Sequence, residues 1–158
     1  MGQLTLHYDE FPGPADCPAA DRELLARATA ALGESYAPYS RFRVAAAARL
    51  ADGTLVTGVN TENAAYPVCL CAERAALAAA ASLRPGLRIT DLAVTVRSPS
   101  RTLDQPAFPC GSCRQVLLEH EARYGAPVRL ILRAETGPVW TFAAAGDLLP
   151  FGFSGEVL

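Results

Sequence analysis

Apolar residues recur at helical spacing in three segments of the chain. Over residues 19–36, leucine and alanine return every three or four positions, which predicts a helix ending near Gly33. Residues 72–83 consist almost entirely of strong helix formers, and their many alanines indicate close packing against a sheet. Residues 111–124 predict the third helix.

Five short apolar runs predict strands. Residues 42–50 and 55–60 flank Asp52 and Gly53, a pair that favours a tight hairpin turn. Residues 91–96, 128–132 and 139–142 predict three more strands. The order helix, hairpin, helix, strand, helix, strand, strand predicts a single α/β domain with one mixed sheet over residues 19–158.

Residues 1–18 differ from this domain in pattern. A brief alternation of apolar and polar residues over positions 4–8 is followed by Pro12, Pro14 and Pro18. Prolines at this density prevent a regular helix. We therefore expect an extended N-terminal arm.

Composition excludes several classes of function. The chain of 158 residues is 51% hydrophobic, which is enough for one core, and 14 basic against 16 acidic residues give a net charge of −2. No basic stretch stands apart from acidic neighbours, so we expect no binding to polymeric DNA or RNA. No apolar run reaches the length of a membrane span and no leader pattern is present, so we expect no membrane association and a cytoplasmic location.

The cysteines point to metal chemistry. Of five cysteines, four form the pairs Cys69-x-Cys71 and Cys110-x-x-Cys113, an arrangement more typical of metal or catalysis than of disulfides in a cytosolic protein. The fifth, Cys17, is expected to be a small buried apolar side chain.

Three of these thiols can form a catalytic zinc site. Cys110 and Cys113 would share one face at the start of a helix, the spacing of half a zinc site, and the positive helix end should lower the pKa of both thiols. Cys71 would open the alanine-rich helix and supply a third ligand. Three thiolates leave the fourth zinc position for water, as in catalytic sites.

Two neighbours of Cys71 complete this hypothesis. Glu73 lies two residues from a ligand and is the candidate proton carrier. Arg74 is the candidate cation that offsets the net negative charge of zinc with three thiolates. In the competing interpretation, Cys69 joins a purely structural four-cysteine site, although Cys69 and Cys71 are too close in sequence for both to ligate comfortably. We assign Cys69 to packing.

The motifs around these residues resemble the small zinc-dependent cytidine deaminase family. They are Cys-Ala-Glu-Arg at 71–74, Pro-Cys-Gly-Ser-Cys-Arg-Gln at 109–115, Tyr-Ala-Pro-Tyr-Ser-x-Phe-x-Val at 36–44, Asn-Thr-Glu-Asn-Ala-Ala-Tyr at 60–66, and the segment 148–153. The likeness covers roughly residues 21–153. It implies a three-layer α/β/α domain with a mixed five-stranded sheet, one Zn²⁺ per chain, and a homotetramer with shared active sites.

The resemblance also implies roles for residues outside the metal site. Phe42 would flank the pyrimidine, Asn60 and Glu62 would bind the ribose hydroxyls, Ala72 would contact the substrate, and Phe153 would enter a neighbouring subunit's pocket. Without the family, Asn60 and Glu62 would be a polar turn, and the two phenylalanines would be core residues.

The implied activity is hydrolytic deamination of cytidine and 2′-deoxycytidine by zinc-activated water, releasing ammonia, as in pyrimidine salvage. Two alternatives within deamination are a substrate with a modified N4 group and an aminonucleoside antibiotic. An alternative of another class is a zinc-stabilised interaction domain without activity, which would have no need of Glu73.

Overall fold

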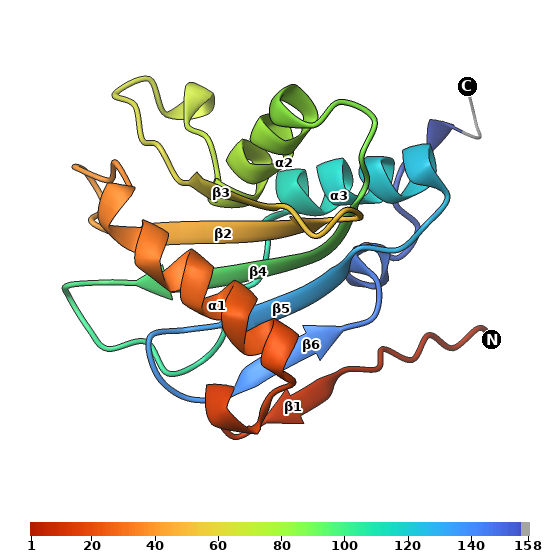
Figure 1. Cartoon of the computed structure of the whole chain (residues 1–158), viewed down its shortest axis with the longest axis horizontal. Helices are drawn as coiled ribbons and strands as arrows, with labels where there is room; N and C mark the ends of the chain where they lie inside the picture. The colour runs from red at the N-terminus through yellow and green to blue at the C-terminus, as the bar shows by residue number, and fades with distance from the viewer. Residues whose placement is uncertain (156–158) are drawn as a thin grey trace.

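The computed structural model describes residues 1–155, and within them one mixed sheet of six strands lies between helices on both faces (Figure 1). The strands run in the spatial order β1-β6-β5-β4-β2-β3, and only β4 and β5 are parallel neighbours. The strands are β1 (Asp9–Phe11), β2 (Arg43–Leu50), β3 (Leu55–Val59), β4 (Ile89–Arg97), β5 (Arg129–Arg133) and β6 (Val139–Phe142). The helices are α1 (Ala19–Ala31), α2 (Ala72–Leu83) and α3 (Gly111–Tyr124).

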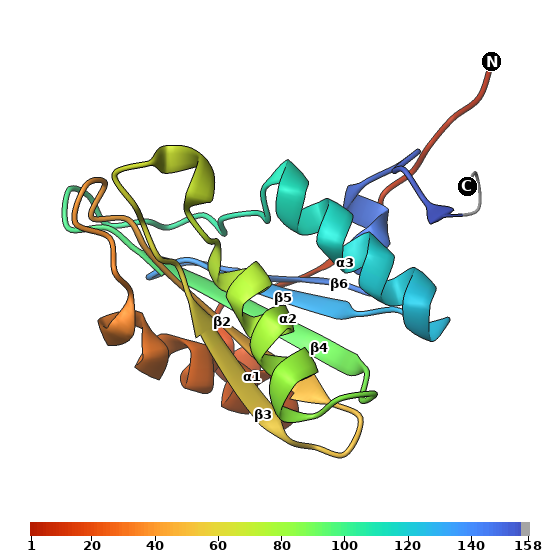
Figure 2. The ribbon, with the colours of Figure 1, turned by 90° about the horizontal axis from the view of Figure 1, so that it is seen from above.

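Helix α1 covers one face of the sheet, and α2 and α3 cover the other, as the view along the sheet shows (Figure 2). This confirms the predicted three-layer α/β/α domain. Among the described residues, no helix has both the length and the apolar character that a membrane span requires.

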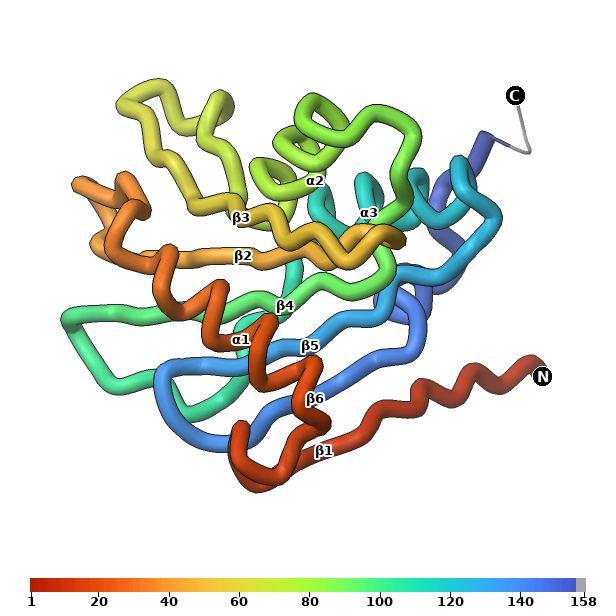
Figure 3. The backbone as a smooth tube through the Cα atoms, in the orientation of Figure 1, coloured from red at the N-terminus to blue at the C-terminus, as the bar shows by residue number. Residues whose placement is uncertain are grey.

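The predicted number of five strands is wrong, because the N-terminal arm contributes a sixth. Strand β1 pairs antiparallel with β6, with Asp9 opposite Thr141 and Phe11 opposite Val139. Without β1, the outer edge of β6 would present unpaired backbone groups. Pairing with β6 in turn stabilises β1, a strand of only three residues. Residues before it continue as an extended segment (Figure 3).

Small side chains bring the layers close together. Ala46 and Ala48 of β2 belong to the core under α2 and α3, whereas Ala47 belongs to the core under α1. All three are fully buried. Cys17 is also buried in the α1 core, which confirms its expected role as a small apolar residue.

Gly58 of β3 allows α2 to lie directly against the sheet. A Cβ atom at this position would stand 2.6 Å from the carbonyl oxygen of Ala72 and would overlap the backbone nitrogen of Ala76. No side chain fits there, because close approach of two backbones leaves room only for glycine. Gly58 therefore sets the depth at which the first turn of α2 sits.

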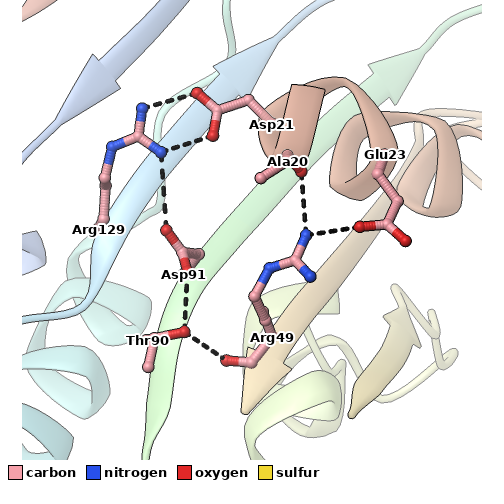
Figure 4. A network of polar contacts seen from close by, with 7 residues as sticks. All are labelled: Ala20, Asp21, Glu23, Arg49, Thr90, Asp91 and Arg129. Carbon is pink, nitrogen blue, oxygen red and sulfur yellow. Dashed lines mark hydrogen bonds and ion pairs between the residues drawn. The ribbon is translucent and has the colours of Figure 1, made fainter. Parts of the chain in front are cut away.

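The α1 layer is fixed to the sheet by an ion-pair network (Figure 4). Arg129 of β5 donates to both carboxylate oxygens of Asp21 on α1, each at 2.6 Å, and its guanidinium lies 3.6 Å from Asp91 of β4. Arg49 of β2 binds Glu23 of α1 at 2.9 Å. Because Asp21 is buried, its bidentate pair with Arg129 satisfies a charge that would otherwise be costly in the interior.

Candidate active site

The N-termini of α2 and α3 meet at the same place on the sheet. Cys71 and Cys110 are the N-cap residues of the two helices, both with extended backbone, and neither side chain makes a capping hydrogen bond. Cys113 follows in the first turn of α3. All three thiols are therefore left available for a ligand at the positive ends of two helices.

The sulfur geometry fits one zinc ion. The Sγ atoms of Cys71 and Cys110 are 3.8 Å apart, those of Cys110 and Cys113 are 3.5 Å apart, and all three lie within 4.8 Å of one another. A tetrahedral site with Zn–S bonds of about 2.3 Å has sulfur-to-sulfur edges of about 3.8 Å. The cluster could thus hold one zinc ion with three thiolates and one open position.

Backbone amides and burial act oppositely on these thiols. Burial raises the pKa of the Cys110 thiol, but the nearby backbone N–H groups of Cys113 and Ser112 and the neighbouring thiols bring that pKa below its ordinary value. Burial raises the pKa of Cys71 and that of Cys113. In the metal-free cluster, the expected lowering of the thiol pKa therefore holds for Cys110 and not for Cys113, whose pKa is raised by burial and by the neighbouring Glu73.

Glu73 projects from the first turn of α2 into the same region. Its side chain is buried, with 5% of the residue exposed, and it has no ion-pair partner within residues 1–155. Burial raises the pKa of its carboxyl, against smaller lowering contributions from its own backbone amide and the Cys113 thiol. A buried, unpaired carboxyl beside a metal site is suited to exchanging a proton with a bound molecule.

A cavity of about 310 Å³ opens over Glu73 and the sulfur cluster. This volume lies at the small end of the range for small-molecule sites, about 300 to 1,000 Å³. Eight residues singled out in the sequence line it: Phe42, Asn60, Glu62, Cys69, Cys71, Ala72, Glu73 and Cys110. Cys113 lies behind them in the core.

Asn60 and Glu62 are held by the protein itself at the cavity wall. The side-chain oxygen of Asn60 accepts hydrogen bonds from the Ser35 hydroxyl at 2.5 Å and the Val44 N–H at 2.8 Å, and its amide nitrogen donates to the Phe42 carbonyl at 2.9 Å. Within residues 1–155, one N–H of the Asn60 amide therefore has no partner, since an amide offers only two. Asn60 fixes the start of β2 and Phe42, which immediately precedes that strand.

Glu62 accepts hydrogen bonds from three groups of one loop. The backbone N–H of Tyr39 donates at 2.8 Å, that of Ser40 at 3.2 Å, and the Ser40 hydroxyl donates to the other carboxylate oxygen. These hydrogen bonds, led by that of the Ser40 hydroxyl, lower the pKa of the Glu62 carboxyl. Glu62 is thus a fixed anionic acceptor at the cavity rim.

Arg74 and Phe153 lie outside this cavity, and Cys69 lines it without joining the sulfur cluster. Arg74 lines a surface groove between α2 and α3 and makes no hydrogen bond to the sulfurs among the described contacts. Phe153 is 62% exposed and does not line the cavity of its own chain. Cys69 lies outside the sulfur cluster, and its sulfur accepts a hydrogen bond from the Asn63 N–H at 3.2 Å.

The cavity also includes residues that were not singled out from the sequence. Ser40, Val94, Val96 and Phe108 contribute to its wall. Phe108 stands two residues before Cys110 in the long loop after β4, and this proximity to a ligand was the available signal.

A zinc site of three cysteines at helix N-termini, with a buried non-ligand glutamate, defines the class of zinc-dependent nucleobase deaminases. Comparison with known proteins supports the same class. The family described as "Cytidine and deoxycytidylate deaminase zinc-binding region" matches residues 18–124, more than half of the chain, and the protein belongs to this family.

Named relatives cover most of the chain. A cytidine deaminase of Mycobacterium tuberculosis is 42% identical over 130 residues, which are 82% of this chain and 86% of that protein. One from Halalkalibacterium halodurans is 37% identical over 137 residues, 86% of this chain and 96% of that protein. The crystal structure of cytidine deaminase from Burkholderia pseudomallei has a TM-score of 0.72 at 40% identity and covers 84% of this chain and 98% of its own.

Proposed function

We propose that this protein hydrolyses cytidine and 2′-deoxycytidine to uridine and 2′-deoxyuridine, with release of ammonia. The observation that carries this proposal is the convergence of three thiols and a buried Glu73 on one cavity whose rim holds a polar pair suited to a sugar. The names of the relatives, all cytidine deaminases, support the same substrate class.

Cys71, Cys110 and Cys113 would hold the zinc ion. When bound, zinc would supply an activated water as the nucleophile at neutral pH. Glu73 would take a proton from that water and deliver it to the pyrimidine. Overall, a bond forms between the water oxygen and C4, the bond between C4 and N4 breaks, and the nitrogen leaves as ammonia.

The remaining cavity residues would orient the nucleoside. Phe42 and Phe108 offer aromatic surfaces to the base, with Ala72 beside it. Glu62 would accept hydrogen bonds from the ribose hydroxyls, and Asn60 would donate its one free N–H. Both side chains are already fixed by the protein, so little conformational freedom would be lost on binding.

The finer proposal is a homo-oligomer, most simply a tetramer, with shared sites. The rings of Phe151 and Phe153 are exposed at the end of the described chain, so neither fills its own core. The main chain at Phe153 is nevertheless held, because Gln115 of α3 donates to its carbonyl at 2.8 Å. A neighbouring subunit would cover these rings, and Phe153 would close that subunit's cavity.

Zinc-loaded protein incubated with cytidine tests the proposed reaction. We expect ammonia release in step with loss of the cytosine ultraviolet band. Release of an amine only from cytidines substituted at N4 would assign the site to modified nucleosides. No turnover of either substrate by protein that retains one zinc per chain would contradict the proposal.

A further inference from the structure

An aromatic cluster joins the N-terminal arm to the wall of the cavity. Trp140 and Phe142 of β6 project from the sheet face covered by α2 and α3. The ring of Tyr8 lies 4.9 Å from that of Trp140 and 5.6 Å from that of Phe142, measured between centroids. The ring of Phe108 meets the same two residues edge-on, at 5.6 Å and 6.0 Å.

Phe108 depends on this cluster for its position. It lies in the loop between β4 and α3, outside regular structure, and 41% of the residue is exposed. Phe108 lines the cavity that contains Glu73, and its ring makes T-shaped contacts with Trp140 and Phe142. A change in the setting of these two rings will therefore move a wall of the cavity.

Tyr8 is placed on the cluster by strand pairing. It immediately precedes β1, in which Glu10 lies opposite Trp140. Side chains two residues apart point to the same face of a strand, so Tyr8 lies over the face that carries Trp140 and Phe142. The indole Nε1 of Trp140 is buried without a hydrogen-bond partner within residues 1–155, in keeping with a ring enclosed by aromatic neighbours.

We propose that Tyr8 is a positioning residue of the nucleoside site. It holds Trp140 and Phe142, and these hold Phe108 against the bound base. The N-terminal arm would in this way set the affinity for the nucleoside without touching it. The identity of the ligand rests on the proposed function; the path from Tyr8 to Phe108 does not.

Trp140 provides a direct readout, because it is the one tryptophan of the sequence. Uridine, the non-reacting product nucleoside, is titrated into zinc-loaded protein while Trp140 fluorescence is followed, and KM and kcat for cytidine are measured in parallel. The variants are Tyr8→Ala, Tyr8→Phe and, as a matched change in the arm outside the cluster, Thr5→Ala.

We expect Tyr8→Ala to shift Trp140 emission to the red and to raise both the Kd for uridine and the KM for cytidine about three- to tenfold, as for loss of one aromatic contact. The kcat should stay within about twofold, since Tyr8 is remote from the proton transfer. Tyr8→Phe should restore affinity, and Thr5→Ala should match the unaltered protein.

The inference is overturned if Tyr8→Ala shifts Trp140 emission but leaves both the Kd and the KM unchanged, because the arm would then only cover an edge strand. If Tyr8→Ala fails to fold, Tyr8→Leu replaces it under the same criterion. Failure of the proposed function looks different: the unaltered protein itself would neither bind uridine nor convert cytidine.

Discussion

Two buried carboxylates lie on opposite faces of the same sheet, and their surroundings differ. Asp21, on the α1 face, receives two hydrogen bonds of 2.6 Å from Arg129. Glu73, on the face covered by α2 and α3, is equally buried yet has no ion-pair partner within the described chain. The protein satisfies the first carboxylate and leaves the second available, which separates a residue of the scaffold from a residue of the site.

The helix starts follow the same division. Helix α1 begins after Pro18, whose side chain has no polar atom, whereas α2 and α3 begin after Cys71 and Cys110, whose thiols belong to the sulfur cluster. The buried carboxylate on the α1 face is therefore held by an ion pair, whereas the buried carboxyl and the thiols of Cys71 and Cys110 on the other face line a cavity. Substitutions on the two faces should therefore separate effects on the free energy of unfolding from effects on turnover.

The largest effect is expected at Cys113, the buried member of the sulfur cluster. Cys113→Ser should lose zinc and all measurable turnover, because two remaining thiolates hold the metal poorly. Zinc per chain by elemental analysis checks this. Cys69→Ser is the matched control, and it should keep its zinc; the reverse pattern would contradict the ligand assignment.

Breaking the ion pair on the opposite face should affect stability alone. Asp21→Asn leaves Arg129 with the more distant Asp91, and we expect a loss of about 3 kcal/mol in the free energy of unfolding. Denaturant titration measures it. Below the unfolding temperature, KM and kcat for cytidine should be unchanged, and the double variant Asp21→Asn/Arg129→Gln should cost less than the sum of the single changes.

Gly58 links the scaffold to the site, so its substitution should affect both. Gly58→Ala places a Cβ against the backbone of α2, and we expect a loss of about 1 to 3 kcal/mol in stability. The kcat should fall as well, because Cys71 and Glu73 lie at the displaced end of α2. Gly33→Ala, where a Cβ would meet nothing within 4 Å, is the control. Normal stability and turnover of Gly58→Ala would show that α2 can shift freely.

The smallest effect concerns His120 of α3, whose Nε2 accepts a hydrogen bond from the Ile89 N–H at 3.0 Å. Burial, with a smaller contribution from Arg123, lowers the pKa of His120 below its ordinary value of 6.5. The unfolded chain then binds the proton more readily than the folded protein does. The contribution of neutral His120 to the free energy of unfolding is therefore present above about pH 6.5 and is lost as the pH falls toward the folded-state pKa.

One titrating group can change the free energy of unfolding by at most about 1.4 kcal/mol per pH unit. His120→Gln keeps an acceptor but does not titrate, so its stability should fall less than that of the unaltered protein between pH 7.5 and 5.5. Parallel pH dependence of the two proteins would remove His120 as the cause.

Local chemistry explains which elements could be predicted from the sequence. The bounds of α2 and α3 match the predicted 72–83 and 111–124, because each begins after a cysteine N-cap and α3 ends at Gly125 in the left-handed conformation. The first helix is predicted to end near Gly33; regular helix stops two residues earlier, at Ala31, and a tighter turn follows over Leu32–Glu34.

Long-range contacts explain what could not be predicted. Strand β1 exists because β6 offers an open edge, and three residues carry no periodicity to reveal it. The place of Phe108 in the cavity depends on Trp140, which is distant in sequence. Arg74 is adjacent to Glu73, yet one step along a helix turns the side chain by about 100°, and Arg74 faces the groove between α2 and α3 instead.

The most direct test of the contrast between the two carboxylates is the turnover of zinc-loaded Glu73→Gln. We expect this variant to retain one zinc per chain and the stability of the unaltered protein, because an uncharged amide replaces a carboxyl whose ionised form is disfavoured by burial. Its kcat for cytidine should fall by at least about 10²-fold, the usual loss for a general acid–base group. Near-normal kcat in zinc-loaded Glu73→Gln would contradict the assignment of proton transfer to this residue.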